Sequence, residues 1–137
     1  MKTKTSELTD RALDWAVVSI ECARPAPFKS IPAILDGTVR IVRADIGAHS
    51  MPVSPSTDWA QGGPIIERER ISISPPLDPL ARQIFKCTMI GFRRSSKGGS
   101  VSTINSGYGP TPLIAAMRCY VASKLGDEVA IPEELTQ

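Results

Sequence analysis

Apolar residues near the start of the chain recur at three- and four-residue steps, the spacing that places side chains on one face of a helix. The pattern predicts a helix over residues 10–22, with Thr9 as its N-cap and Leu8 packing back onto it as a hydrophobic staple. Pro25 and Pro27 end this helix. Its buried face is expected to carry Ala12, Leu13, Ala16, Val17 and Ile20.

A second helix is predicted near the end of the chain. Thr111 is a suitable N-cap, Pro112 stands at the first helical position, where a missing N–H costs nothing, and Gly126 supplies a left-handed C-cap. We expect Arg118 and Tyr120 on its outer side, at the surface or facing a pocket. The opposite, buried side is expected to carry Leu113, Met117, Val121 and Leu125.

Shorter apolar runs between these helices predict strands. Residues 38–43 form one strand after an Asp-Gly turn. The clearest hairpin has strands at residues 83–92 and 100–105, joined by a loop at residues 94–99. Residues 67–73 are a strand candidate, although their charges would equally suit a solvent-facing turn of helix.

The remaining segments are polar. Residues 47–63, rich in Ser, Pro, Asp and Gly, predict a long loop, which in a small domain is usually functional or disordered. Residues 127–137 are expected to be extended and partly anchored by their apolar side chains. Together these segments predict an α+β fold, with a small antiparallel sheet packed against two helices in a single domain over residues 1–137.

Charge and hydropathy narrow the possible partners. The net charge is only +2 and the two signs are mixed, which argues against binding of long nucleic acid. No apolar run approaches the roughly 20 residues that cross a membrane, and no apolar segment follows the first lysines. We therefore expect no membrane association and a place in the cytoplasm. Local clusters do occur, basic at Arg82, Lys86, Arg93, Arg94 and Lys97 and acidic in the tail.

The chain has few residues suited to metal binding or acid–base catalysis. Cys22, Cys87 and Cys119 are odd in number and far apart, as reduced packing cysteines are, and His49 is the single histidine. We expect neither a metal nor another cofactor. Familiar catalytic motifs are absent, which favours binding over catalysis, while chemistry based on carboxylates or lysine stays open.

The most distinctive polar segment contains Ser56, Thr57, Asp58, Trp59, Gln61, Gly62 and Gly63. It combines hydroxyls, a carboxylate, an amide and an indole with glycines that let a backbone approach a ligand closely. These groups suit recognition of a planar ring with attached hydroxyls and an anion. The alternative is structural, with Trp59 inside the core and Asp58 and Thr57 capping turns.

A second candidate lies at residues 105–112, where a glycine-rich turn leads into the predicted second helix. The free N–H groups at a helix N-terminus favour a negative charge, so Thr111 could face an anion, with Tyr108 and Arg118 nearby. The alternative is again structural, because Gly-Pro-Thr-Pro sequences commonly serve as helix caps and prolines have no N–H to donate.

Three sequence blocks are long enough to be compared with known families. They are residues 8–17 (LTDRALDWAV), 54–69 (SPSTDWAQGGPIIERE) and 109–135 (GPTPLIAAMRCYVASKLGDEVAIPEEL). In this order they resemble the phage NinX-like family. The resemblance implies a gene of tailed phages or prophages whose product lies outside the virion, and it implies no catalytic mechanism.

We therefore predict a phage accessory protein in the host cytoplasm that binds a nucleotide-derived small molecule, such as a cyclic ADP-ribose immune signal, without converting it. Trp59 would stack, Asp58 and Gln61 would contact ribose or base, Gly62, Gly63 and Thr111 would offer amides to phosphate, and Tyr108 or Arg118 would form a second wall. A homo-oligomer would help to enclose the ligand. The alternatives are a protein-interaction module using residues 93–97 or the acidic tail, and a small nucleotide-cleaving enzyme.

Overall fold

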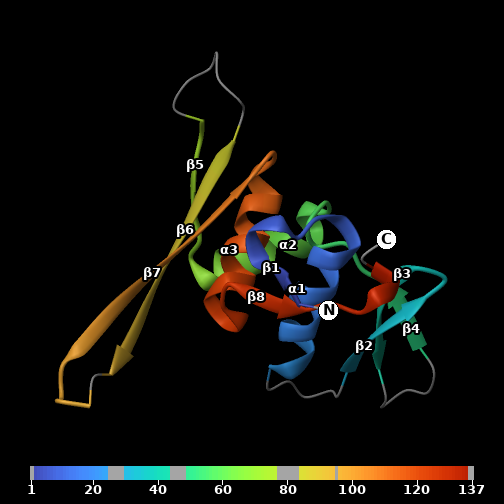
Figure 1. The fold of residues 1–137 in the computed structure, drawn as a ribbon, viewed down its shortest axis with the longest axis horizontal. Helices are drawn as coiled ribbons and strands as arrows, with labels where there is room; N and C mark the ends of the chain where they lie inside the picture. Colours follow the sequence, from blue (N-terminus) through green and yellow to red (C-terminus); the bar gives the residue numbers. More distant parts are fainter. Residues whose placement is uncertain (1, 25–29, 44–48, 77–83, 95, 136–137) are drawn as a thin grey trace.

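Three helices occupy the middle of the molecule, with small sheets around them (Figure 1). The computed structural model describes residues 2–24, 30–43, 49–76, 84–94 and 96–135, and the statements below concern those residues. The helices are α1 (Asp10–Ala23), α2 (Trp59–Glu69) and α3 (Pro112–Leu125). Helix α3 lies in the centre and contacts both other helices.

Eight strands make three antiparallel sheets in the described residues. The first sheet pairs β1 (Lys2–Lys4) with β8 (Glu128–Ala130), the second has the order β2 (Ser30–Leu35), β3 (Thr38–Arg43), β4 (His49–Pro52), and the third has the order β5 (Ser72–Ser74), β6 (Phe85–Arg94), β7 (Ser100–Gly109). Short 3-10 helices span Thr5–Glu7 and Glu133–Leu135. The predicted α+β class is confirmed, and the fold is one domain. The expected antiparallel pairing and helix packing are found, in three small sheets around three helices, because two of the sheets pair neighbouring strands and the third joins β1 to β8.

Both predicted helices form where their apolar spacing places them, although Leu125, expected on the buried side of the second helix, is 45% exposed at the end of α3. In α3 the Thr111 hydroxyl accepts a hydrogen bond from the Ile114 N–H at 3.1 Å, and Gly126, at φ 88°, follows as the C-cap. In α1, Thr9 has the extended backbone of an N-cap but makes no side-chain capping bond. Leu8, 1% exposed, packs into the core beside it.

Helix α2 was not predicted as a whole. The prediction of a loop through residue 63 is wrong, because α2 begins at Trp59 and β4 lies within the same stretch. Of the two alternatives for residues 67–73, the helix is found as far as Glu69, and only Ser72–Ser74 form a strand. Glycines and Pro64 hide the helical pattern, and contacts with the rest of the protein overcome their low helix propensity. The helix ends at Arg70, whose φ of 55° lies in the left-handed region that glycine usually fills.

The predicted hairpin is confirmed and is longer than expected, since its return strand β7 continues to Gly109. Residues 83 and 95 of the prediction lie outside the described residues.

Two glycines explain why α3 can lie directly on β7. A Cβ on Gly107 would overlap the Ala115 carbonyl, and one on Gly109 would crowd the Ala115 N–H.

The chain ends are tied together by the short β1–β8 pair, with Thr3 opposite Val129. Val129, Ile131 and Leu135 are buried, so the prediction of a partly anchored tail is confirmed. The pairing also brings residues from the first and last tenths of the chain beside α3.

A polar network joins all three helices on one side of α3. The Tyr120 hydroxyl donates to Glu21 Oε1 at 2.7 Å, and Arg68 Nη2 donates to the same oxygen at 2.6 Å and to the Tyr120 hydroxyl at 3.1 Å. Tyr120 is fully buried, so the expectation that it lies on the outer side of its helix is wrong. Seven residues separate it from Leu113, about two helical turns, so both face the same side.

Candidate functional site

The distinctive polar segment around α2 uses most of its polar groups to hold its own backbone. Asp58 is the N-cap of α2, with Oδ1 accepting from the Ala60 N–H at 2.9 Å. Gln61 Oε1 accepts from the Ser54 N–H at 2.7 Å, and its Nε2 donates to Asp58 Oδ2 at 3.2 Å. The capping role considered for Asp58 is therefore found, and Gln61 braces the same turn.

Ser56 and Gly62 serve packing. The Ser56 N–H donates to Asp14 Oδ1 at 2.8 Å, and both residues are buried, with Ser56 1% and Asp14 5% exposed. Burial raises the pKa of Asp14 above its ordinary value, although this hydrogen bond acts to lower it. A Cβ on Gly62 would overlap the Pro55 carbonyl and the Leu113 side chain. The Gly62 N–H already donates to the Asp58 carbonyl at 2.9 Å, so this amide does not face a ligand.

Three residues of the segment face outward. Thr57 is exposed, Gly63 has open space beyond its Cα, and the Trp59 side chain is 53% exposed. The alternative in which Trp59 fills the core is wrong. The Trp59 indole is therefore exposed at the surface, while the side chains of Asp58 and Gln61, which were expected to bind the ligand with it, form hydrogen bonds within their own segment.

The two candidate segments do meet, through close packing of Gly62 against Leu113 at the start of α3. The Thr111 hydroxyl is used as a helix cap. Arg118 lies five residues beyond Leu113, about 500° around the helix, and so projects from nearly the opposite side of α3. The structure therefore divides the predicted residues into an α2 region and a separate region that contains Tyr108 and Arg118.

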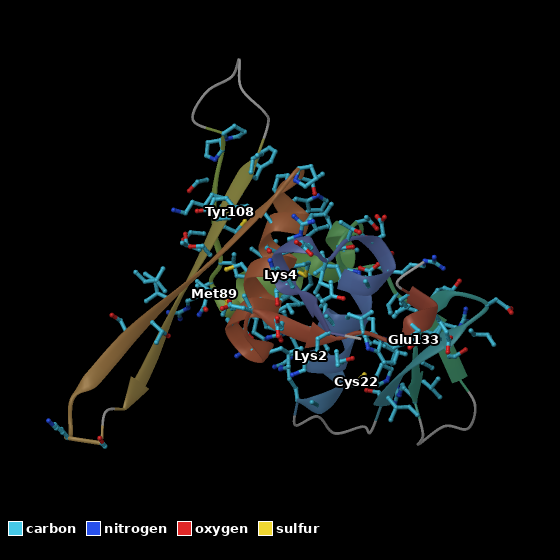
Figure 2. The ribbon with its side chains drawn as sticks, in the orientation of Figure 1. Lys2, Lys4, Cys22, Met89, Tyr108 and Glu133 are labelled. Carbon is cyan, nitrogen blue, oxygen red and sulfur yellow. The ribbon has the colours of Figure 1, made fainter. Side chains whose placement is uncertain are left out.

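Tyr108 and Arg118 line a surface cavity of about 260 Å³ between β7, α3 and the joined chain ends. Residues 4–6 and 106–107, with Ala122, Asp127 and Glu128, complete its wall. Figure 2 labels Tyr108 on β7 and Lys4 near the chain start, the two sides of this region. Sequence reasoning missed residues 4–6, Asp127 and Glu128, because β1–β8 pairing brings them here and no local pattern signals such a contact.

Arg118 is held in place by backbone carbonyls. Its Nε donates to the Leu8 carbonyl at 2.9 Å and its Nη1 to the Tyr108 carbonyl at 2.7 Å. Burial lowers the pKa of Arg118 from its ordinary value, and no carboxylate in the described residues lies within ion-pair distance of it. Since guanidinium carries five N–H donors, these two bonds leave further donors for a bound anion.

The rest of the cavity adds an aromatic ring and groups of both charges. The Tyr108 side chain is 54% exposed, and Lys86 Nζ lies 5.9 Å from the centre of its ring. Thr5 ties the acidic side together, with its N–H donating to the Asp127 carbonyl at 2.7 Å and its hydroxyl to the Gly126 carbonyl at 2.6 Å. The cavity thus has a cation held without a carboxylate partner and two acidic residues in its wall, with the exposed ring of Tyr108 on the adjoining strand.

A second cavity, of about 270 Å³, lies between α1, α2 and the β3–β4 strands. Its wall is mainly apolar and includes Val18, Ile41 and Met51. The charged groups on it, Glu21 and Arg68, already pair with each other at 2.6 Å. An anion there would have to displace Glu21, so the cavity beside Tyr108 and Arg118 is the better candidate.

The described residues offer little to a metal ion or a thiolate mechanism. No group of three or more His, Cys, Asp or Glu residues among them could hold a metal. Cys22, Cys87 and Cys119 are free thiols. Burial raises the pKa of Cys87 to about 12 and that of Cys119 to about 11, so both stay protonated at neutral pH.

Fold and site together define a small α+β protein with a mixed-charge surface cavity beside its central helix. A family model described as bacteriophage P22 NinX matches residues 4–124, and the chain belongs to that family. It is a phage accessory protein, as the three sequence blocks indicated. No curated protein matches the sequence. Across the described part of the chain, no helix combines the length and apolar content needed to cross a membrane.

Proposed function

We propose that this phage accessory protein acts in the host cytoplasm as a non-enzymatic binder of an anionic, nucleotide-derived small molecule, and so sequesters a host immune signal of the cyclic ADP-ribose type. The binding site is the cavity lined by Tyr108 and Arg118. The observation that carries the proposal is the state of Arg118, a partly buried guanidinium without a carboxylate partner in the described residues.

A cation that has lost part of its hydration and has no counter-ion gains free energy when an anion binds. Phosphate oxygens accept from the fork of guanidinium donors with good geometry. Lys4 lines the same cavity and adds a second positive charge. Asp127 and Glu128, also in its wall, can accept from ribose hydroxyls or a base amino group. Tyr108 supplies an exposed aromatic surface for a base.

The size of the cavity limits the ligand. At about 260 Å³ it falls slightly below the roughly 300–1,000 Å³ of ordinary ligand pockets. It therefore suits one nucleotide unit better than a whole cyclic dinucleotide. A larger ligand would extend past the opening, and association of two or more copies would cover the exposed part.

The test is a thermal-shift screen with AMP, ADP-ribose, cyclic ADP-ribose and inorganic phosphate, followed by calorimetric titration of the compounds that stabilise the fold. A ligand at about 100 times its dissociation constant adds roughly 2.7 kcal/mol of stability, a shift of several degrees in Tm. Tyr108→Leu is expected to weaken nucleotide binding about tenfold, because stacking on the ring is lost.

Trp59→Leu is the matched control, since the two aromatic side chains are 53% and 54% exposed. It is expected to bind nucleotides as the wild type does. If Trp59→Leu loses binding and Tyr108→Leu keeps it, the ligand binds at the start of α2 and the cavity is the wrong site. If none of the compounds stabilises the protein, the sequestration proposal fails and a protein-interaction role takes its place.

Mass spectrometry of ligand released by denaturation separates sequestration from enzymatic cleavage. Ligand recovered unchanged after hours at 37 °C supports a binder, whereas a changed mass identifies a nucleotide-cleaving enzyme. The control is the same incubation with Tyr108→Leu at equal protein concentration, which corrects for breakdown of the nucleotide in solution.

A further inference from the structure

The β6–β7 ribbon extends well beyond the helices (Figure 1). Met89, labelled in Figure 2, is buried where the ribbon passes α3, and the part beyond it extends away from the body. β7 is the last strand of its sheet, so in the part of the chain that the structure describes no strand pairs with its outer edge.

This edge lacks the features that usually prevent strand association. β7 is ten residues long, and its sequence SVSTINSGYG contains no charged residue and no proline. Protected edge strands are typically short, or carry lysine, proline or a bulge. β6, by contrast, carries Lys86, Arg93 and Arg94. β5 covers the outer edge of β6 only at residues 86–88, so both edges of the projecting part are unpaired in the described residues, and the β7 edge is the uncharged one.

The outward-facing backbone groups of β7 can be identified. The Tyr108 carbonyl accepts from Arg118, which places it on the side of β7 away from β6. Because hydrogen-bonding direction alternates along an antiparallel strand, Ser102, Ile104 and Ser106 also direct their N–H and C=O groups outward. These three residues are exposed.

An apolar pair marks the middle of the same stretch. Ile104 lies directly opposite Ile90 on β6, and their side chains are 69% and 61% exposed on the face turned away from α3. Two isoleucines this exposed, side by side on a projecting ribbon, contribute little to the stability of a monomer.

We propose that the β7 edge pairs with the β7 edge of a second copy of this chain, antiparallel about a two-fold axis at Ile104. The second copy's Ser106 then lies opposite Ser102, and about six backbone hydrogen bonds form. The isoleucine pairs of the two copies join into one row of four across a continuous six-stranded sheet. Ser106 belongs both to this edge and to the cavity wall, although the argument for the pairing uses no ligand.

A further feature favours a second copy as the occupant. An uncharged edge meets its own copy without like-charge repulsion, which a basic or acidic edge would suffer. The two-fold arrangement also places Ile104 opposite the second copy's Ile104, so the exposed isoleucines of the two copies meet.

Sedimentation velocity over a concentration series tests the pairing. The contact is smaller than the roughly 1,600 Å² of a standard interface, so a dimer with a dissociation constant of micromolar order is expected. Ile104→Lys places two positive charges on the axis and is expected to raise this constant at least tenfold. The control Ile31→Lys alters an isoleucine that is 57% exposed on another sheet, and should leave the dimer intact.

Cysteine cross-linking tests the register. Residues opposite each other in a hydrogen-bonded pair have Cα atoms about 5.5 Å apart, within the disulfide range. Ile104→Cys should therefore form a disulfide-linked dimer on mild oxidation. Ser102→Cys alone should not, whereas an equal mixture of Ser102→Cys and Ser106→Cys should.

A wild-type chain that stays monomeric at its highest soluble concentration overturns the proposal, and so does a dimer that survives Ile104→Lys. Circular dichroism melting of each variant verifies that the monomer is folded, which is expected because both isoleucines are exposed. A dimer that binds none of the nucleotides upholds this inference while the proposed function fails, so the two outcomes are separable.

Discussion

The two sides of α3 each hold a partly buried arginine, and the two arginines differ in their partners. Arg68 pairs with Glu21 at 2.6 Å and touches the Tyr120 hydroxyl, and although burial acts against its charge these bonds raise its pKa. Arg118 meets only carbonyls in the described residues, and burial lowers its pKa. The first arginine completes a structural network, whereas the second leaves donors available. Polar composition alone therefore does not identify a binding site, because what matters is whether the polar atoms already have partners.

The largest expected effect is at the contact between α2 and α3, on the side of α3 that faces Arg68. Gly62→Leu should destabilise the fold by at least about 3 kcal/mol, because the new side chain overlaps the Pro55 carbonyl and Leu113. Gly63→Ala is the control, and should stabilise by roughly 0.5–1 kcal/mol because its Cβ meets open space within the same helix. Urea denaturation measures both. Equal effects from the two substitutions would mean that the contact between α2 and α3 is not tight.

The next effect concerns the paired arginine. Glu21→Gln should destabilise the protein by roughly 1–3 kcal/mol at pH 7, since Arg68 and Tyr120 lose a charged acceptor. Burial acts to raise the pKa of Glu21, but the bonds from Arg68 and Tyr120 outweigh it and lower the pKa below the ordinary 4.5. Because the pKa of Glu21 is lower in the folded protein than in the unfolded chain, the ionised carboxylate stabilises the fold above pH 4.5. This stabilisation is lost as the pH falls through the pKa of Glu21 in the folded protein. The difference between wild type and variant should therefore shrink below pH 4.5, and a difference that is constant with pH would contradict this account.

A smaller effect tests the unpaired arginine. Inorganic phosphate above its dissociation constant should stabilise the wild type by about 1 kcal/mol more than chloride at equal ionic strength. Arg118→Gln should remove this increment, while Arg24→Gln, at the exposed arginine that follows α1, should keep it. Comparing the variants cancels the general stabilisation that phosphate gives to any protein. Equal increments in all three proteins would show that Arg118 binds no anion.

The smallest expected effect is at the exposed indole. Trp59→Leu should change the free energy of unfolding by no more than about 0.5 kcal/mol, because the side chain is 53% exposed. Thermal unfolding measured by circular dichroism is the appropriate test, since it does not depend on the fluorescence of the removed indole. A loss of several kcal/mol would show that Trp59 packs against the body of the protein and is needed for its stability.

Several features of the fold and site follow from local sequence. Apolar residues at four-residue steps, Thr111 and Gly126 predicted α3, and the polar loop between two apolar runs predicted the β6–β7 hairpin. Tyr108 and Arg118 were also named from local sequence, and the structure brings both to one cavity. The family resemblance was also seen in short local blocks, and a family model matching residues 4–124 shows the family.

Other features depend on contacts between distant residues. α2 forms despite two glycines and a proline, since Gly62 and Ile65 pack against the body of the protein. Asp127 and Glu128 reach the cavity through the β1–β8 pair, more than 120 residues from Lys4. The partners of Arg68 and Arg118 likewise come from other elements. Spacing along the chain sets which residues share a helix face or strand, whereas pairing of charges and donors needs three-dimensional proximity, which no local pattern contains.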